Sequence, residues 1–518
     1  MAVRESLFQF VCGIVMFAGA AGLAPAQLAP AGGPGQTTRA TPLPMSGRTN
    51  QSGAASAQQS SAPGTGASTI SSSVQVSGNF AGSVPGNVPP GAITLTLADA
   101  VKRGLEANLG PISAQNSLQM ARAQRGQALS ALLPSIGANA SETVTQIDLA
   151  AYGFKFNVPA NFGFSIPTVV GPFSYSQAQA TLNQSVLDLV ARRNWKASKE
   201  TEQASLLSAK DARETVVLAV AGTYLQTVAA AARVVSEQAQ VENAQAIYNQ
   251  AVTRKQAGTN ARIDVMRSLV ELQTEQQRLS SLTADLRKQK IALARLIGLP
   301  LDREIILSDP LAPPEGSVPE AEAQVRLAFK HRSDLQAAEA QMRAAELALS
   351  ASHAERLPSA SLNGDYGVIG PNPASTHGVF AATASVTVPI WEGGRIRSDI
   401  QAAEATLKQR RAELQDQRAQ VEQEVRTALI ELETAMGQVR LAASNRSYAN
   451  ETLSEARDRF GAGVATTVEV VQAQEQVAAA EADYVSSLFS FNLAKLSLAR
   501  ATGEAEADIQ HLFTGNRP

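Results

Sequence analysis

The sequence contains a single cysteine, Cys12, and this scarcity excludes several kinds of site. Cys12 lies within an apolar stretch at residues 6–23, which follows Arg4 and precedes small residues at 24–26. The pattern predicts a secretory signal peptide at 1–26, with a retained membrane anchor as the alternative. A lipidated cysteine would lie at the far end of the apolar stretch, so lipidation is not expected. The cleaved chain would have no disulfide, no thiol nucleophile and no cysteine-based metal site.

Aromatic residues, histidine and excess charge of either sign are also scarce. Aromatic residues make up 5% of the chain, which is low for a globular enzyme, and 44 basic residues stand against 46 acidic ones. This balance, without a basic block, argues against nucleic acid as a partner.

No glycine-rich phosphate loop follows a predicted strand, and the histidines lack metal-like spacing, so we expect no enzymatic activity and no cofactor. The histidines are His331, His353, His377 and His511.

Residues 27–92 are rich in glycine, proline, serine, alanine and glutamine and show no apolar periodicity. A segment of this composition cannot bury enough apolar surface to offset the entropy lost on ordering. The sequence therefore predicts a disordered leader at 27–92, with folded sequence beginning near Ile93.

The rest of the chain is one unit written twice. The tripeptide Leu-Pro-Ser at 133–135 recurs at 357–359, and the matches continue beyond it at a smaller shift, so the first copy contains an insertion. A duplication that keeps its register over this length indicates a true internal repeat. We therefore predict a first repeat at 93–313 and a second at 314–513, separated by a proline-rich linker.

Each repeat is predicted to be mainly helical. An amphipathic helix, at 97–131 and again at 319–355, precedes two short alternating segments, a very long helix and a shorter one. The long helices, at 190–256 and 395–460, contain no proline and would each extend roughly 100 Å. The shorter helices carry apolar residues every seven positions, which predicts coiled-coil packing. An ordinary buried helical hairpin explains these heptads equally well.

The alternating segments predict β-strands with one apolar and one polar side. In the last of them, Phe380, Ala382 and Ala384 lie on the opposite side from Thr383. Strands of this kind cross an outer membrane as a barrel around a wet lumen, although a soluble sheet gives the same pattern. Four strands per chain cannot close a barrel, so several chains would share it. After the signal, the segment closest to a transmembrane helix is 216–235, and spanning is not expected there.

The insertion of the first copy lies at 150–173 and is rich in aromatic residues, among them Tyr152 and Phe164. One interpretation is an extracellular loop that covers the pore mouth. The other is an aromatic girdle at the membrane interface.

In their order, the elements from 93 to 513 resemble the TolC family of outer-membrane efflux proteins. Residues 95–100 (Leu-Thr-Leu-Ala-Asp-Ala) are similar to the family's opening helix, and both Leu-Pro-Ser tripeptides to its helix-to-strand junctions. Residues 388–395 (Val-Pro-Ile-Trp-Glu-Gly-Gly-Arg) are close to its strand-to-helix signature, whereas 184–190 in the first copy lack the glycines. Residues 460–463 resemble the tip of a helical hairpin.

The resemblance implies a mainly α fold with short β-strands. Three chains would form one tube, with a β-barrel in the outer membrane, four strands per chain, continued by a long periplasmic α-helical barrel. The implied function is an exit duct of a tripartite efflux or type I secretion system that conducts cargo passively. Its partners would be outer-membrane lipid, a periplasmic adaptor and an inner-membrane transporter. The alternative is an envelope coiled-coil protein with a structural or adhesive role.

The hairpin tips are the candidate gate. Gly258 and Gly463 fit turn positions that need an unrestricted backbone. Asp264 and Glu469 match acidic positions that, in the family, line the periplasmic constriction. In a trimer each would form a ring that repels, selects cations or pairs with basic residues. Capping of the returning helices is an equal alternative.

Basic residues near the tips are the candidate partners of these carboxylates. They are Arg254, Lys255, Arg262 and Arg459. The family's gating aromatic residue matches Phe460, which has no hydroxyl, and a second-tip arginine matches Ala465. These departures argue against a closely TolC-like gate network.

Overall fold

The computed structural model describes residues 55–61, 70–86, 91–153, 167–258, 261–314 and 316–506. The predicted signal peptide at 1–26 and the first part of the predicted leader, 27–54, lie outside these residues. The described residues all belong to one compact unit, Met45–Pro518.

The first half of this unit consists of a helix pair, two strands and a helical hairpin. Its elements are α2 (Leu97–Ala107), α3 (Leu109–Ser130), β4 (Ser135–Asp148), β5 (Val169–Leu187), α4 (Leu189–Gln256) and α5 (Arg262–Leu296). The second half repeats this order in α6 (Ala321–His331), α7 (Ser333–Ala354), β7 (Ser359–Gly370), β8 (His377–Thr387), α8 (Arg395–Gly461) and α9 (Thr467–Thr502).

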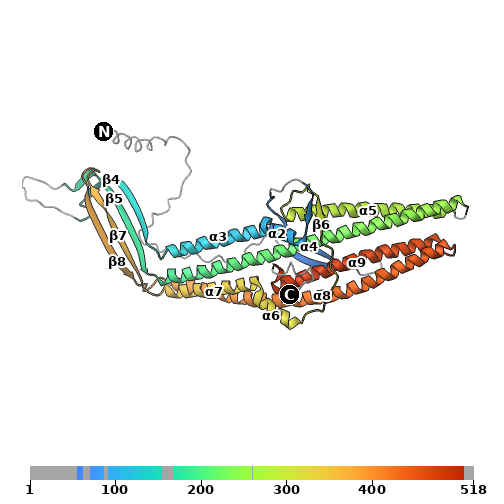
Figure 1. Ribbon diagram of the computed structural model, residues 1–518. Coiled ribbons are helices and arrows are strands. Elements are labelled where there is room, and N and C mark those ends of the chain that lie inside the picture. The colour runs from blue at the N-terminus through green and yellow to red at the C-terminus, as the bar shows by residue number, and fades with distance from the viewer. Residues whose placement is uncertain are drawn as a thin grey trace, which may run out of the picture. The chain divides into compact units, whose positions relative to one another are not determined.

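The strands of both halves form one sheet. Its order is β4-β5-β7-β8, and every neighbouring pair is antiparallel. Each strand pair leaves one helix and returns directly into the next, so the sheet continues from one end of the helices (Figure 1). The opposite ends of the helices are the two hairpin turns, between α4 and α5 and between α8 and α9. The topology thus separates the sheet from the turns by the length of α4 and α8.

Two helices predicted as single rods are each interrupted. The predictions for 97–131 and 319–355 were wrong at Asn108 and Arg332, which have extended ψ angles of 141° and 118°. The Asn108 side chain accepts the Gly110 N–H at 2.8 Å and donates to the Phe80 carbonyl at 2.8 Å. Arg332 is buried, and its guanidinium contacts carboxylates. At both breaks a buried polar side chain is placed by tertiary partners.

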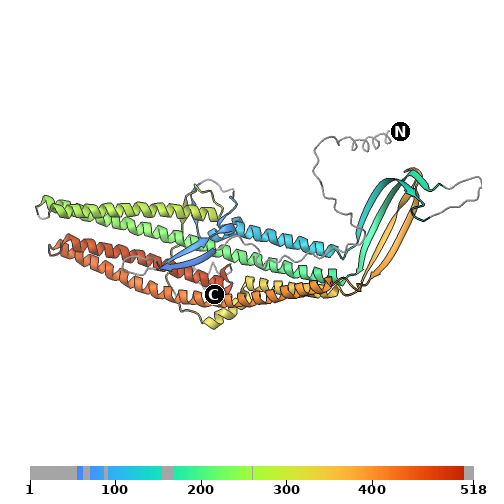
Figure 2. The same ribbon diagram turned by 180° about the vertical axis from the view of Figure 1, so that it is seen from behind.

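Part of the predicted disordered leader is ordered, which corrects that prediction. β1 (Ala55–Ser61) and β2 (Ile70–Val76) form an antiparallel hairpin, followed by the short helix η1 (Gly78–Ala81). Figure 2 shows the hairpin lying across the helices, where it contacts α4 and α9. Val74 packs against the main core, and Phe80 is 2% exposed. These few apolar residues supply buried surface, although the average composition of residues 27–92 is polar and predicts none.

The main hydrophobic core surrounds the middle of α4, where nearly every residue from 216 to 225 is buried. It packs against α2, α5, α9 and a two-stranded parallel sheet of β3 (Ile93–Leu95) and β6 (Ile305–Leu307). Among the described residues, α4 alone is long and apolar enough to cross a membrane. Because 72% of that apolar window is buried inside the protein, α4 is a core helix.

Tyr224 ties α4 to the parallel sheet and to the linker between the halves. Its ring is fully buried, and its hydroxyl donates to the Leu95 carbonyl at 3.0 Å. The same oxygen accepts the Asp309 N–H at 3.4 Å. A carboxylate oxygen of Asp309 in turn accepts the Leu97 N–H at 2.6 Å, so the start of α2 belongs to the same network.

We expect Tyr224→Phe to destabilise the protein by about 1–2 kcal/mol, because buried backbone groups lose their hydroxyl partner. The measurement is the unfolding midpoint of detergent-purified protein, followed by circular dichroism. Tyr248→Phe, on the same helix, is the control, since that hydroxyl has no hydrogen-bond partner among the described residues. Equal midpoints for both variants would contradict the assigned role of Tyr224.

Candidate functional site

Each helical hairpin turns at a glycine with a left-handed backbone. Gly258 has a φ of 78° and Gly463 a φ of 79°. A Cβ at either position would meet no atom within 4 Å, so the backbone conformation rather than space requires glycine. Both residues therefore occupy turn positions of the kind that the sequence predicts. Residues 259 and 260 lie outside the described part of the chain.

The two predicted acidic residues lie in the first turns of α5 and α9. Glu469 forms a capping box: its Oε1 accepts the Thr466 N–H at 3.2 Å, and its Oε2 lies 3.5 Å from Arg459. Asp264 has no such cap, and its carboxylate lies 3.9 Å from Arg267. In the single chain, Glu469 thus caps α9. Asp264 stabilises α5 through its negative charge near the N-terminus of that helix.

Arg254 connects the first hairpin tip to the second. Its Nη1 donates to the Phe460 carbonyl at 3.1 Å and its Nη2 to the Gly461 carbonyl at 3.4 Å. Its guanidinium also lies 4.2 Å from the centroid of the Phe460 ring, which is a cation–π distance. Since these carbonyls end α8, the positive charge also opposes the negative end of the helix dipole. We call this set of contacts the Arg254 latch.

The remaining basic candidates differ from Arg254 in their surroundings. Arg459 pairs with Glu469, as the sequence reasoning allowed. Lys255 and Arg262 are exposed and have no ion-pair partner among the described residues. The sequence reasoning missed Arg267, although its position three residues after Asp264 on a helix was a usable signal.

Next to the latch lies a small apolar cluster between the second hairpin and α4. Phe460 is buried and packs with Val470 and with Ile247 from α4. The missing hydroxyl of Phe460 is consistent with this surrounding, because a phenol there would need a polar partner. The aromatic residue therefore contributes packing and a ring face to the latch.

The four-stranded sheet has an apolar face that is exposed in the single chain. Cross-strand register places Ala138, Ala180, Tyr366 and Phe380 in one row. The next row contains Ile136, Leu182, Gly364 and Ala382. Tyr366 is 71% exposed and Phe380 80% exposed. Such a surface is unfavourable in water and suits contact with hydrocarbon.

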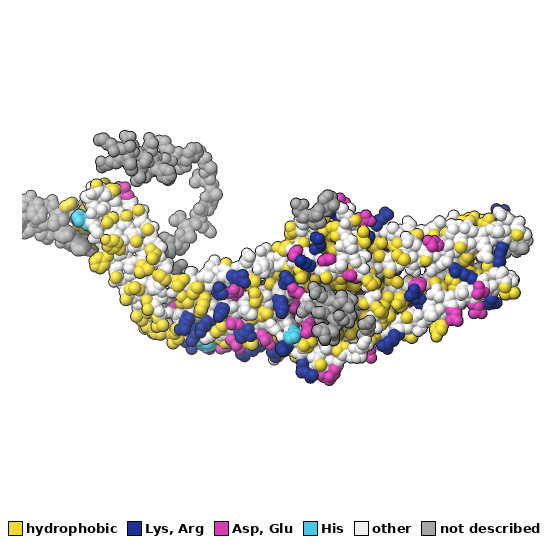
Figure 3. Space-filling model, in the orientation of Figure 1, with side chains coloured by type: hydrophobic (Ala, Val, Ile, Leu, Met, Phe, Trp, Pro, Cys, Tyr) yellow, Lys and Arg dark blue, Asp and Glu magenta, His cyan; other side chains and the backbone are white. Residues whose placement is uncertain are grey.

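The opposite face of the same sheet is polar. Its rows contain Asn139, Gln179, Asn183, Asn363, Asp365 and Thr383. Glu142, which weakens the alternation of the first strand, lies on the apolar face opposite Ser176. Figure 3 shows mostly hydrophobic and uncharged surface over the strands, with most Lys, Arg, Asp and Glu gathered over the helices. The sheet therefore fits a place between lipid and water.

A charged zone begins directly after the sheet. Ile390 and Trp391, which follow β8, are 95% and 85% exposed. At the start of α8, Arg395 binds Glu355 at 2.7 Å and Asp399 at 2.8 Å. An exposed tryptophan between an apolar band and ionic residues is typical of a membrane–water interface. The predicted aromatic insertion at 150–173 is described only in part, and its last residues belong to β5.

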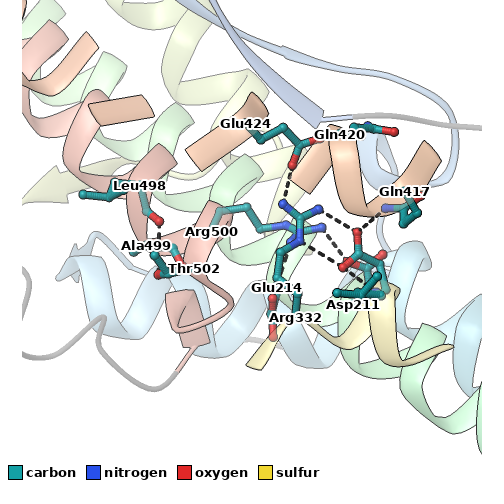
Figure 4. Close-up of polar contacts among 12 residues, drawn as sticks. Asp211, Glu214, Arg332, Gln417, Gln420, Glu424, Leu498, Ala499, Arg500 and Thr502 are labelled. Carbon is teal, nitrogen blue, oxygen red and sulfur yellow. Dashed lines mark hydrogen bonds and ion pairs between the residues drawn. The ribbon is translucent and has the colours of Figure 1, made fainter. Parts of the chain in front are cut away.

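A buried cluster of ion pairs joins the two halves near the middle of the helices. Arg500 of α9 lies 2.5 Å from Asp211 and 3.5 Å from Glu214, both on α4. Arg332, at the break between α6 and α7, pairs with Asp334 at 2.6 Å and with Glu424 of α8. Figure 4 shows Arg332 and Arg500 among these acidic groups. Gln417 also donates to Asp334, at 2.8 Å.

The protonation of this cluster reflects its burial. Burial raises the pKa of Glu214 to about 7, against the opposing effect of Arg500. Burial also raises the pKa of Asp211, whereas the hydrogen bonds from Arg332 hold the pKa of Asp334 below its usual range despite burial. The sequence reasoning missed this cluster, because its members come from four helices distant in sequence. Its contacts indicate a structural role.

Within the described part of the chain, no group of three or more His, Cys, Asp or Glu side chains is arranged to hold a metal ion. A groove of about 540 Å³ lies between α4, α8 and α9. Its lining includes Asn243, Arg446 and Glu481, and Arg446 is bound to Glu481 at 2.6 Å. The groove is therefore polar and charged, and it opens on the helices that lead to the hairpin tips.

Solved structures of outer-membrane channels share this fold. The Campylobacter jejuni CmeC outer membrane channel matches with a TM-score of 0.69, over 81% of this chain and 90% of that chain, at 18% identity. VceC of Vibrio cholerae matches with a TM-score of 0.67, over 79% and 96%, at 20% identity. The fold is thus that of the TolC-like outer-membrane channels.

The model of the outer membrane efflux protein family matches residues 112–299 and 325–504, and the chain belongs to this family. The pyoverdine export outer membrane protein OpmQ of Pseudomonas putida is 24% identical over 329 residues, 60% of this chain and 67% of that protein. The outer membrane protein OprJ of Pseudomonas aeruginosa is 24% identical over 380 residues, 70% of this chain and 77% of that protein.

These matches confirm the predicted TolC-like fold of long helices and short β-strands, the outer-membrane location with a periplasmic extension, and the role as an efflux channel protein. The family is one of channels rather than enzymes, and its members work with periplasmic adaptors and inner-membrane pumps. The alternative of an envelope coiled-coil protein without a channel is not supported.

We expect Glu214→Gln to gain stability relative to the natural chain as pH rises. The folded pKa of Glu214, about 7, lies above its ordinary value of 4.5, so the stability it contributes is present below pH 4.5 and is lost as pH rises through 7. Glutamine does not ionise, so the variant does not lose stability in this way as pH rises. The measurement is the melting temperature at pH 5 and pH 8.

Glu242→Gln is the matched control, since Glu242 is exposed on the same helix and has no ion-pair partner among the described residues. Its melting temperature relative to the natural chain should not change between the two pH values. If Glu214→Gln behaves in the same way as this control, the pKa of Glu214 is not raised by burial.

Proposed function

We propose that three copies of this chain form one passive exit duct, which conducts cargo across the outer membrane and performs no chemistry of its own. The observation that carries the proposal is the two-faced sheet, apolar on one side and polar on the other. Its edge strands, β4 and β8, have no further partner within the sheet. A closed barrel needs about eight strands or more, and three copies of four strands give twelve.

The helical part supports the same assembly. Ile263, Met266 and Val270 lie along one side of α5 at helical spacing, and all three are about half exposed or more. In a trimer this stripe would pack against a neighbouring copy, which would bury it and complete a helical barrel. The exposed apolar stripe and the open sheet thus favour the same kind of partner, a second copy of the chain.

Energy for export would come from other proteins. In this proposal a periplasmic adaptor contacts the hairpin tips and links the duct to an inner-membrane transporter, as in other members of the family. The polar groove between α4, α8 and α9 lies on the helices that lead to these tips and would suit a helical hairpin with charged side chains. Export of drugs, metals or proteins would all use a similar duct, since the transporter selects the cargo.

The gate, in this proposal, lies at the hairpin tips. The Arg254 latch holds the first tip against the second with two hydrogen bonds and one ring contact. Such contacts at the surface are weak enough to open without unfolding the helices. In a trimer, Asp264 and Glu469 would add one ring of three carboxylates each, whose mutual repulsion favours opening.

The test of the assembly is electron microscopy of the full chain, expressed with its signal in a bacterium with two membranes and extracted in detergent. A three-fold tube with a detergent belt at the sheet end is the expected result. A soluble rod without a belt, or a particle without three-fold symmetry, would overturn the proposal.

We expect Arg254→Met to raise the resting conductance of the purified channel in planar bilayers. The change removes both hydrogen bonds and the ring contact of the latch and keeps an apolar side chain of similar length. Lys255→Met removes the same charge from the neighbouring position, which makes no latch contact, and should leave the conductance unchanged. An equal rise in conductance for both variants would show that charge at the tip, not the latch, controls opening.

A further inference from the structure

The polar face of the sheet carries one carboxylate. β4, β5, β7 and β8 together contain no lysine or arginine, and their acidic residues are Glu142, Asp148 and Asp365. Glu142 lies on the apolar face, opposite Ser176. Asp148 lies at the end of β4, where its side chain accepts the Ala150 N–H at 3.0 Å. Asp365 is thus the only acidic side chain in the polar rows of these strands.

The side chains in the same cross-strand row as Asp365 are small. Its cross-strand neighbours are Thr181 on β5 and Ala381 on β8, and Gly137 on β4 is the next residue of the same row. Asp365 is partly exposed and has no hydrogen-bond or ion-pair partner among the described residues. Short neighbours leave the carboxylate uncovered, and the absence of basic residues from the four strands leaves its charge uncompensated.

We infer that Asp365 sets a cation preference in the barrel part of the duct. The inference rests on the proposed trimer, in which lipid takes the apolar face and the polar face therefore lines the lumen. Three-fold symmetry would then place three Asp365 carboxylates at one height in the lumen. A ring of uncompensated carboxylates attracts cations, including cationic cargo, and repels anions. The other titratable groups in the polar rows are His377, two rows away on β8, and Tyr175 on β5.

The size of the effect depends on ionic strength. In a wide wet lumen, three carboxylates act on passing ions only within a Debye length, which is ~10 Å at ~0.1 M salt and ~30 Å at ~0.01 M. The preference should therefore be strong in dilute salt and weak in concentrated salt. This dependence distinguishes a ring of fixed charge from a narrow steric filter, which selects at any salt concentration.

The experiment measures the reversal potential of the full-length channel in planar bilayers under a gradient of dilute KCl. All variants carry Arg254→Met, so that opening at the tips does not limit the current. The parent channel should prefer K⁺ to Cl⁻, and Asp365→Asn should lower the permeability ratio by roughly threefold or more in dilute salt. Asp365→Glu should restore the ratio, which separates loss of charge from loss of structure.

Two controls locate the effect. Glu142→Gln removes a carboxylate from the apolar face of the same sheet and should leave the ratio unchanged. The double variant Asp264→Asn with Glu469→Gln removes the carboxylates of the tips. If this double variant abolishes the preference while Asp365→Asn leaves it unchanged, selectivity belongs to the tips and the inference is overturned.

The result also separates this inference from the proposed function. A purified chain that gives no conductance in any variant overturns the proposed duct, and the role of Asp365 with it. Conductance with an unchanged permeability ratio in Asp365→Asn overturns the role of Asp365 alone and leaves the duct intact.

Discussion

The structure depends on a sheet that cannot meet its physical requirements within a single chain. Tyr366 and Phe380 are exposed on one face, whereas Asn363 and Asp365 lie on the other. The apolar face is unfavourable in water, and the polar face is unfavourable in hydrocarbon. The sheet is therefore stable only with hydrocarbon on its apolar side and water on its polar side. Its edge strands also carry backbone groups that hydrocarbon cannot satisfy. Closure with further copies would meet both requirements at once.

The long helices depend on contacts of two different strengths. Near their middle, the buried ion pairs of Arg332 and Arg500 join α4, α7, α8 and α9, and loss of one partner there would leave an unpaired buried charge. At the tips, the Arg254 latch lies near the surface, where a charged contact contributes little. In the proposed duct, this gradient would allow the tips to separate while the middle of the helices stays together.

Patterns that are local in sequence predicted local structure well. The alternation around Phe380 predicted a strand, and the turns at Gly258 and Gly463 have the left-handed backbone that glycine permits. The helix breaks at Asn108 and Arg332 were not predicted, because neither is a helix breaker by propensity. Each is held out of the helix by partners far along the chain, such as the Leu296 carbonyl for Asn108. The leader hairpin was missed for the same reason, since its apolar residues are few and pack on distant helices.

By itself the sequence determined the repeat, the long proline-free helices, the two-sided strands and the glycine turns, because each follows from the conformational preferences of neighbouring residues. Only the tertiary structure decided which charges meet. Arg254 was expected beside carboxylates and contacts the Phe460 ring and carbonyls that end α8. Arg500 meets Asp211 across a contact between the two repeats. Such pairings depend on how helices from different repeats pack against one another, and local periodicity does not encode that packing.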